Sequence, residues 1–257
     1  IVHSCGFDSI PFDLGVRMTQ IEATKRFGKP ASRVRGRVRA MAGTFSGGTA
    51  ASLTATMKAA AKKPALINVL RNPFALAEGF EGPSQPTGMV PLYEKDLDKW
   101  AAPFVMAPIN TKNVHRTNAL LGHPYGEDFQ YDEMMLTSPG DAGKKMAEAA
   151  AEMMKNPFGA KPPKPGEGPS KEERENGFYD VLFVAENPDG SGDNLHFGVK
   201  GKYDPGYGST SRMIAETGMG LLSSKADGGV GTPGSFLGEA LVDRLQEHAE
   251  ITFAVES

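Results

Sequence analysis

The sequence has few of the residues that mark the special classes of protein. Its 257 residues include one cysteine, Cys5, so no disulfide can form within the chain and a reducing compartment is expected. No apolar run approaches the ~20 residues of a membrane helix, and no secretory signal pattern opens the sequence. The net charge of -3 gives no electrostatic reason to expect a nucleic acid as partner. We therefore predict a cytoplasmic protein that binds a small molecule or another protein.

Several catalytic and binding signatures are missing as well. No His, Cys, Asp or Glu cluster has metal-ligand spacing, so we predict no metal site. No G-x-S-x-G motif marks a serine nucleophile. Residues 229–234 match G-x-G-x-x-G, but no strand precedes them and 23 residues follow them, too few for a βαβ unit. We interpret this segment as a loop that leads into a helix.

The hydrophobic periodicity alternates between 2 and 3.6 residues, which predicts a sheet flanked by helices. Strands are expected at residues 32–42, 129–137, 178–186, 195–203 and 251–255. Helices are expected at residues 11–27, 48–63, 64–70, 110–121, 143–155, 209–223 and 235–247. Because regular βαβ spacing is absent after residue 28, the predicted fold is α+β with a mixed, largely antiparallel sheet.

Two segments and one helix have unusual composition. Residues 74–91 and 156–176 are rich in Gly and Pro and are expected to be irregular. The amphipathic helix at residues 143–155 carries Met146, Ala150 and Met153. Core packing or surface docking explains these side chains most simply, and contact with a lipid-like substrate or a membrane face is the alternative.

The amino-terminal residues read as an apolar strand start, a turn and a helix led by Pro11, with no initiating methionine. A strand needs neighbours to satisfy its backbone. We therefore expect that part of a sheet lies upstream and that the chain is the downstream part of a larger enzyme.

Motifs in order along nearly the whole chain resemble one family. They are C-G-F-D-S-I-P at residues 5–11, S-G-G-T-A-A-S at 46–52, F-V-M-A-P-I-N-T at 104–111, R-T-N-A-L at 116–120, D-P-G-Y at 204–207 and the segment 229–245. The sequence is similar to saccharopine dehydrogenase-like oxidoreductases, in particular to bacterial trans-acting enoyl reductases. The first two motifs are the most specific.

The resemblance implies a division of the chain and a cofactor. Residues 1–27 would be the last βα piece of a nucleotide-binding Rossmann domain whose phosphate loop lies upstream. Residues 28–257 would form an α+β substrate-binding and dimerisation domain, with the last helix and strand packed back on the Rossmann part. The family implies NADP(H) as cofactor and a homodimer. Because most of the nucleotide pocket would be missing, we expect this chain alone to be inactive.

The turn at residues 5–11 is the first candidate site. It lies at the carboxyl end of a strand and before a helix, where Asp8 or Ser9 can cap the helix or face a ligand. The resemblance places the cofactor against Cys5, Gly6, Phe7, Asp8, Ser9 and Pro11. Cys5 is expected to be a small buried residue rather than a reactive thiol.

Candidate substrate contacts follow in the second domain. The loop Ser46, Gly47, Gly48 and Thr49 opens a helix, so its amides and hydroxyls can cradle a carbonyl or simply cap that helix. A second set, Asn110, Thr111 and Arg116, lies at helical spacing and could form a clamp. The candidate proton donors are Asp8, His115 and Tyr207, and for the last two a structural role is the simpler interpretation.

Four arginines alternate along the strand at residues 32–42, and they are Arg33, Arg35, Arg37 and Arg39. They could line a groove for phosphopantetheine or a carrier protein. A sheet face paired across strands with Asp128 and Asp132 is the simpler interpretation.

These expectations favour the substrate domain of an NADP(H)-dependent oxidoreductase that reduces the C=C bond of an enoyl thioester, either free or carrier-bound. Two alternatives stay open. One is a non-catalytic, dimer-forming scaffold of the same fold. The other is a saccharopine-type amino-acid dehydrogenase, which would need a charged clamp for two carboxylates.

Overall fold

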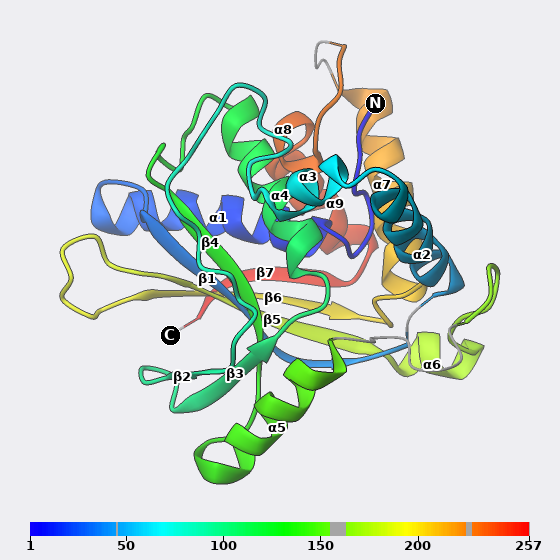
Figure 1. Cartoon of the computed structure of the whole chain (residues 1–257). Coiled ribbons are helices and arrows are strands. Elements are labelled where there is room, and N and C mark those ends of the chain that lie inside the picture. Colours follow the sequence, from blue (N-terminus) through cyan, green and yellow to red (C-terminus); the bar gives the residue numbers. More distant parts are fainter. Residues whose placement is uncertain (45, 155–162, 225–227, 257) are drawn as a thin grey trace.

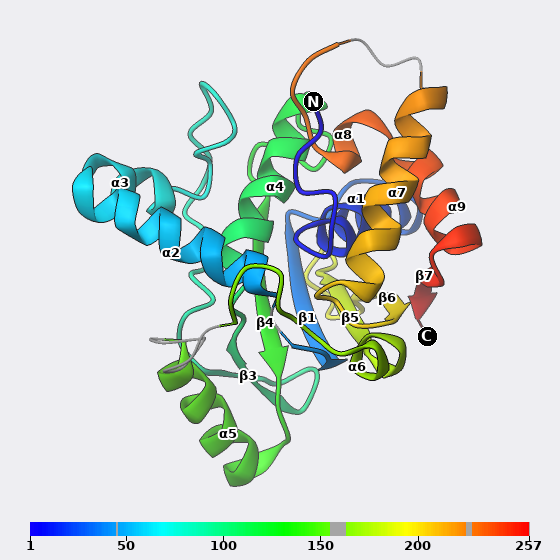
Figure 2. The ribbon, with the colours of Figure 1, turned by 90° about the vertical axis from the view of Figure 1, so that its right-hand side faces the viewer.

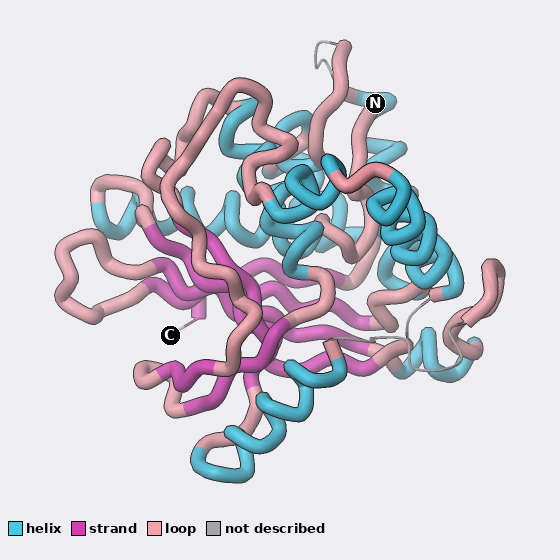
Figure 3. The backbone as a smooth tube through the Cα atoms, viewed as in Figure 1, coloured by secondary structure: helices cyan, strands magenta, loops and turns pink. Residues whose placement is uncertain are grey.

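A computed structural model describes residues 1–44, 46–154, 163–224 and 228–256 of the chain. They form a seven-stranded sheet in the order β2-β3-β4-β1-β5-β6-β7 (Figures 1 and 3). The strands are β1 (Arg33–Ala42), β2 (Leu92–Glu94), β3 (Lys99–Pro103), β4 (Gln130–Leu136), β5 (Phe178–Ala185), β6 (Leu195–Lys202) and β7 (Ile251–Glu256). β1 and β4 are parallel, and the other neighbouring pairs are antiparallel. The predicted mixed, largely antiparallel α+β fold is confirmed.

Helices cover the two faces of this sheet unequally. They are α1 (Ile10–Phe27), α2 (Gly47–Lys62), α3 (Ala65–Arg71), α4 (Ala107–Leu120), α5 (Gly140–Met153), α6 (Lys171–Asn176), α7 (Gly208–Ser223), α8 (Pro233–Phe236) and α9 (Glu239–His248). Figure 1 shows α1, α4, α7, α8 and α9 gathered on one face, whereas α5 lies beyond the β2–β3 edge. Figure 2 shows α2 and α3 projecting away from the sheet as an arm.

The main core lies between the sheet and α1. Pro11 stands in the first turn of α1, and Gly28 ends the helix in the left-handed conformation with φ 76°, which glycine adopts without strain. Gly15 brings α1 so close to β5 that a side chain there would overlap the ring of Phe183. Buried residues from α1, β1, β5, β6, β7 and α9 join in one hydrophobic cluster. Residues 1–27 therefore pack into the core of the sheet, and their assignment to a separate domain stays a prediction.

Most predicted elements match the structure within a few residues. The strongest case is the hairpin β5–β6, in which Phe178 pairs with Lys202 and Ala185 with Leu195. The alternation along β1 is also confirmed, because Val34 and Val38 are fully buried in the main core. The opposite face of β1 carries the arginines.

Three expectations about local structure were wrong. Residues 1–5 form no strand, because Val2 pairs with Gly231 through a single bridge. The helix predicted at residues 235–247 is divided at Gly238, whose φ of 51° breaks the helical path. The end of the predicted loop 156–176 is the helix α6, which begins with a capping box between Ser170 and Glu173. Residues 156–162 of that loop lie outside the described residues, and the short strands β2 and β3 were not predicted.

The methionines of α5 do not pack in the core. Met146 and Met153 are 54% and 69% exposed, and the helix instead buries Gly143 and Ala147 where it lies against β3. Of the helices in the described ranges, none has the length and apolarity that crossing a membrane requires.

Candidate functional site

A cavity of about 530 Å³ lies at the edge of the sheet where β1, β4 and β6 end, and we call it the Asp8 cavity. The topology explains its position. β6 is antiparallel to β5, which is antiparallel to β1, so β1, β4 and β6 run in the same direction and their carboxyl ends share one edge. Met41, Met135 and Pro205 reach the cavity from these three ends. This edge is where α/β sheets bind their ligands.

Apolar side chains form most of the cavity wall. Phe104, Val105 and Met106 line it from the segment between β3 and α4, opposite Met41 and Met135. Methionine side chains are flexible and adapt to irregular apolar ligands. No lysine, arginine or histidine is found among the described residues that line this cavity. The wall is therefore suited to an uncharged chain.

The amino-terminal turn supplies one end of the cavity through Gly6, Phe7 and Asp8. It is tied to α7, because the Phe7 amide donates to the Thr210 hydroxyl at 2.9 Å. Gly6 lies so close to Thr210 that a Cβ there would stand 2.9 Å from its methyl carbon. This close approach holds the turn, and with it Asp8, in a fixed position.

Asp8 has no charged partner in the cavity. One of its carboxyl oxygens, Oδ1, is buried and accepts no hydrogen bond from the described residues. Burial raises the pKa of Asp8 to about 7, because water can no longer stabilise the charged form. A carboxyl group with this pKa can hold a proton near neutral pH and give it to a bound molecule.

A second buried acid, Glu133, lies behind the turn. It is fully buried on β4 and accepts a hydrogen bond of 2.8 Å from the Asn110 amide. Its other oxygen has no partner among the described residues, although the Tyr131 hydroxyl lies beside it against Gly36. Burial raises the pKa of Glu133 well above its usual range, and the nearby charge of Asp8 raises it further. The two acids therefore form an unneutralised pair of buried carboxyl groups.

Two hydroxyl groups face the cavity from the start of α2. Ser46 is the N-cap, and its Oγ accepts a hydrogen bond of 3.1 Å from the Thr49 amide. The Ser46 and Thr49 hydroxyls also lie 3.0 Å apart, so one donates to the other. The second hydroxyl proton stays free for a ligand. This loop thus caps the helix and lines the cavity at once.

Tyr207 closes the cavity near its mouth. Its amide donates to the buried carboxylate of Asp204, and its hydroxyl donates to the Glu167 carbonyl at 3.3 Å. Gly168 lies against its ring, where a side chain would overlap it. Residues 167–168 therefore hold Tyr207 in place, and its hydroxyl proton is already donated to a backbone carbonyl.

The other predicted cofactor contacts lie outside the cavity wall. Cys5 is half-buried, and burial together with the charge of Asp13 raises the pKa of its thiol. Ser9 is the N-cap residue of α1, but its hydroxyl accepts a hydrogen bond from Asn113 instead of capping the helix. Pro11 is buried in the first turn of α1. In the second loop, Gly47 bonds to Glu167 through its amide and Gly48 is exposed.

Four further candidates also lie outside the cavity wall. His115 is buried between the rings of Phe74 and Phe129, and burial lowers its pKa to about 4, so it is neutral. Thr111 bonds its own helix, Arg116 donates to the carbonyls of Leu76 and Val230, and Asn110 bonds Glu133. Their assignment as catalytic or substrate contacts stays a prediction.

The arginine face of β1 is closed by carboxylates. Arg33 pairs with Asp132, and Arg37 pairs with Asp132 at 3.0 Å and with Glu94 at 2.5 Å. Asp128, also expected here, makes no ion pair with the described residues, because it lies in the turn before β4. Glu94 of β2 takes its place. This face therefore has a structural explanation.

Sequence reasoning missed most of the apolar wall and the acid behind it. Phe104, Val105 and Met106 carry the family resemblance, and that was the available signal. Met41 and Met135 are the penultimate residues of β1 and β4. The sequence alone does not show which residues at the ends of strands line a cavity. Glu133 lies far from Asp8 in the chain, and only the sheet topology brings them together. In the described ranges, no three His, Cys, Asp or Glu side chains gather in a way that could hold a metal.

Comparison with known proteins supports the family resemblance. A Mycobacterium tuberculosis protein whose name places it among the trans-acting enoyl reductases is 34% identical over 95% of this chain and 64% of its own length. The trans-acting enoyl reductase of Mycobacterium ulcerans is 28% identical over 99% of this chain and 67% of its own length. The chain is similar to trans-acting enoyl reductases along nearly its whole length.

These comparisons have clear bounds. The chain spans slightly less than two thirds of the M. tuberculosis relative, so that relative has a segment with no counterpart here. No family model matches the sequence, and no solved structure matches it.

Proposed function

We propose that this chain forms the acyl-binding part of an NADPH-dependent enoyl reductase. The observation that carries the proposal is the Asp8 cavity: apolar walls of about the size of a medium acyl chain, with an unpartnered carboxyl group and a free hydroxyl proton at one end. The names of the similar mycobacterial proteins agree with it.

The residues around Asp8 fit the nicotinamide end of the cofactor, but they offer no site for its phosphates. Gly6, Phe7 and Asp8 line this end of the cavity, and the unpartnered oxygen of Asp8 can accept a hydrogen bond from an amide. The G-x-G-x-x-G match at residues 229–234 offers no phosphate cradle, because the Gly231 amide donates to Ile1 and the Gly234 amide donates to Asp13. We propose that the rest of the cofactor site belongs to the segment that the longer relatives have in addition. When bound, NADPH supplies the hydride.

The chain's own residues have three tasks in this proposal. The apolar wall binds the acyl chain and excludes water from it. The free hydroxyl proton of the Ser46 and Thr49 pair donates to the thioester carbonyl and stabilises the negative charge that develops there. Asp8 donates a proton to the α-carbon.

Asp8 is a better proton donor than the other two candidates. The pKa of Asp8 is raised to about 7, so its neutral form is populated at neutral pH. Tyr207 already donates its proton to Glu167. His115 is neutral and lies between aromatic rings outside the cavity wall.

The cavity gives less support to an amino-acid substrate. A saccharopine-type dehydrogenase must hold two carboxylates, and the described lining residues of the Asp8 cavity include no cationic side chain to do so. A non-catalytic scaffold would have no need of an unpartnered carboxyl group, which costs stability. We therefore favour the enoyl substrate.

The test is NADPH oxidation by the full-length protein with 2-octenoyl-pantetheine as substrate. Asp8→Asn should lower kcat by about 100-fold or more, because the amide cannot donate the proton in the same way. Asp243→Asn, on the exposed face of α9, is the matched control and should leave kcat unchanged. Full activity of the Asp8 variant would remove Asp8 from the mechanism, and absence of reduction by the wild type would contradict the proposed function.

A further inference from the structure

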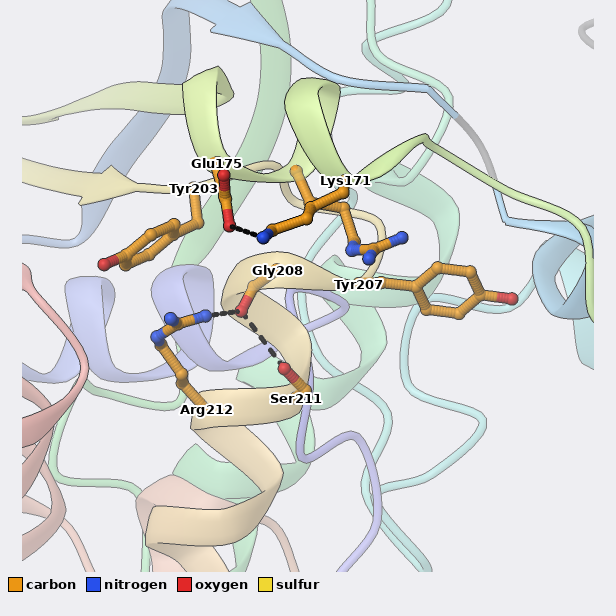
Figure 4. A pocket seen from close by; sticks show the side chains of 8 residues that line it. Lys171, Glu175, Tyr203, Tyr207, Gly208, Ser211 and Arg212 are labelled. Carbon is orange, nitrogen blue, oxygen red and sulfur yellow. Dashed lines mark hydrogen bonds and ion pairs between the residues drawn. The ribbon is translucent and has the colours of Figure 1, made fainter.

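A second cavity, of about 290 Å³, lies beside the first, and we call it the Arg212 cavity. α6 lines it on one side with Lys171, Arg174 and Glu175, and α7 lines it on the other with Ser211 and Arg212. Figure 4 shows the labelled side chains of α6 and α7 facing one another across this space. The cavity thus brings three cationic side chains together with one carboxylate.

Neither arginine of this cavity has a carboxylate partner in the described part of the chain. Arg174 donates one hydrogen bond to the Pro169 carbonyl at 2.8 Å, and Arg212 donates one to the Gly208 carbonyl at 2.7 Å. Each guanidinium group has five N–H donors, so most donors of both groups stay available. By contrast, Arg33, Arg35, Arg37 and Arg39 all pair with carboxylates.

Arg212 is also held in position before any ligand binds. Its guanidinium carbon lies 3.6 Å from the centre of the Tyr203 ring. A stacked arginine loses less conformational freedom when it binds an anion, because its fork is already oriented. The Ser211 hydroxyl stands next to it and donates its proton to the Gly208 carbonyl at 3.2 Å, so the arginines are left as the donors for a ligand.

The neighbouring carboxylates compensate the positive charge of this cavity only in part. Asp204 is buried and accepts hydrogen bonds from the amides of Tyr207 and Gly208. Glu250 accepts from the Tyr203 hydroxyl and from Lys202, and the charge of Arg212 also helps to lower its pKa, although the two groups form no ion pair. Glu175 lies 3.7 Å from Lys171, and both side chains are largely exposed, so that pair is weak. The lining residues keep an excess of two positive charges, three cations less one carboxylate.

The two cavities adjoin each other at Tyr207, which lines both of them. A ligand with an apolar chain in the Asp8 cavity can therefore extend past this residue toward the arginines. Acyl thioesters in cells are carried on pantetheine arms that end in a phosphate ester. Two arginine forks match the several oxygens of a phosphate better than they match a single carboxylate.

We propose that the Arg212 cavity binds the phosphate group of the pantetheine arm that presents the acyl chain to the Asp8 cavity. This inference rests on the proposed function for the acyl end of the ligand, whereas the phosphate site stands on Arg174 and Arg212. The same phosphate chemistry occurs in a carrier-bound arm and in coenzyme A, and the two sources differ in the nucleotide that only coenzyme A carries.

The test is isothermal titration calorimetry of the full-length protein with four ligands: pantetheine, 4′-phosphopantetheine, octanoyl-pantetheine and octanoyl-4′-phosphopantetheine. The phosphate should strengthen binding by about tenfold with either arm, as expected for charge-assisted hydrogen bonds. This gain should shrink as NaCl rises from about 50 to about 300 mM. Coenzyme A that binds no better than phosphopantetheine would indicate the carrier-bound source, and tighter binding of coenzyme A would indicate the free thioester.

Variants of the two arginines test whether these side chains cause the phosphate gain. In the double variant Arg174→Gln/Arg212→Gln the phosphate gain should fall below about twofold, while the octanoyl gain persists. Arg71→Gln, on the exposed helix α3, is the matched control and should keep both gains. Circular dichroism and melting temperatures check that each variant is folded. A phosphate gain that is absent in the wild type, or unchanged in the double variant, overturns the proposal.

Titration of a variant of the Asp8 cavity separates this inference from the proposed function. Met41→Trp fills part of the Asp8 cavity and should abolish the octanoyl gain while it leaves the phosphate gain. An octanoyl gain that is absent in the wild type would contradict the proposed function and leave the phosphate site standing. Binding of inorganic phosphate without any phosphate gain for either arm would overturn the inference, because the anion site would then have no connection to the acyl ligand.

Discussion

The arginine face of β1 and the carboxyl edge of the sheet differ in whether their charged side chains form ion pairs. On the face, Arg39 pairs with Asp180 and Glu256 at 2.5 Å each, and it holds the pKa of Glu256 down to about 2. At the edge, Asp8 has no cation beside it, and Arg212 forms no ion pair with a carboxylate among the described residues. The same residue types are neutralised in one region and left unpaired in the other.

This difference indicates which charges serve the fold and which can serve a ligand. A buried charge without a partner costs stability, and folded proteins rarely keep one without a use. Paired charges such as those of Arg37 and Glu94 are explained by the structure itself. In the described part of the chain, the two cavities at the carboxyl edge are lined by charged groups without an ion-pair partner, so function is expected there. The predictions below test this contrast through the energies of the two regions.

The largest effect is expected where a buried ion pair is broken. Glu94→Gln removes the charge that faces Arg35 and Arg37, of which Arg37 is 1% exposed. The positive charges of the two guanidinium groups are then no longer fully balanced by carboxylates. Because these charges are buried, the free energy of unfolding should fall by about 3–5 kcal/mol in urea denaturation.

Its control is an exposed glutamate. Glu148→Gln on α5 should change the free energy of unfolding by less than about 0.5 kcal/mol. A Glu94 variant as stable as the wild type would mean that this face does not depend on its ion pairs.

A smaller effect of opposite sign is expected for Asp8. Its pKa is raised from 3.8 to about 7 in the folded protein, so the folded state holds the proton more tightly than the unfolded state. Stability that is present at pH 4 is therefore lost as the pH rises toward 7. Asp8→Asn removes this dependence and should be more stable than the wild type by about 2–4 kcal/mol at pH 8, with almost no difference at pH 4.

Urea denaturation at several pH values measures the difference between the Asp8 variant and the wild type. The raised pKa of Asp13 is shared by both proteins and cancels in this comparison. The charge of Asp8 also raises the pKa of Glu133, so its removal acts in the same direction and adds to the stability of the variant at high pH. A variant that is less stable than the wild type at pH 8 would show that Asp8 has a charged partner in solution.

Glu133 offers a matched contrast to Glu94, because both are buried glutamates. Glu133 has no cation beside it, and burial raises its pKa well above the usual range, so it is expected to be neutral. Glu133→Gln keeps the acceptor for Asn110 and should change the free energy of unfolding by less than about 1 kcal/mol at pH 7. A loss as large as that of Glu94→Gln would mean that Glu133 is charged and paired.

Much of the fold could be predicted from the sequence, because its strongest signals are local. The alternation of arginines with Val34 and Val38 in β1 and the turn formers between β5 and β6 each identify an element within a few residues. β2 has three residues, too few for a periodicity, and it supplies Glu94, so this partner of Arg37 could not be found, whereas Asp132 on the longer β4 was predicted. α6 was hidden in a segment whose composition is typical of loops.

The candidate site was predictable only in part for the same reason. The motifs around Asp8 and Ser46 are contiguous, and both line the cavity. The neighbours that decide their chemistry are far away in the sequence. Glu133 of β4 bonds Asn110 of α4 and feels the charge of Asp8, and Arg212 of α7 lines the same cavity as Arg174 of α6. A single sequence gives no signal for such contacts.

The smallest effect on stability is expected at the Arg212 cavity, where the contrast with Arg39 is sharpest. Arg39→Gln leaves Asp180 and Glu256 without their guanidinium partner and should cost about 1 kcal/mol, since these side chains are partly exposed. Arg212→Gln leaves no carboxylate unpaired. The stacking lost on Tyr203 is offset by weaker repulsion from Arg174 and Lys171, so the change should stay within about 0.5 kcal/mol.

Added anion should reverse the order of these two variants. A ligand that binds only the folded state stabilises it. About 10 mM phosphate should therefore raise the melting temperature of the wild type and of Arg39→Gln above the value in chloride at equal ionic strength, and should leave Arg212→Gln unchanged. Differential scanning fluorimetry measures this shift. If phosphate raised the melting temperature of all three proteins equally, the unpaired arginine would have no more to do with anions than the paired one, and the contrast between the two regions would lose its functional meaning.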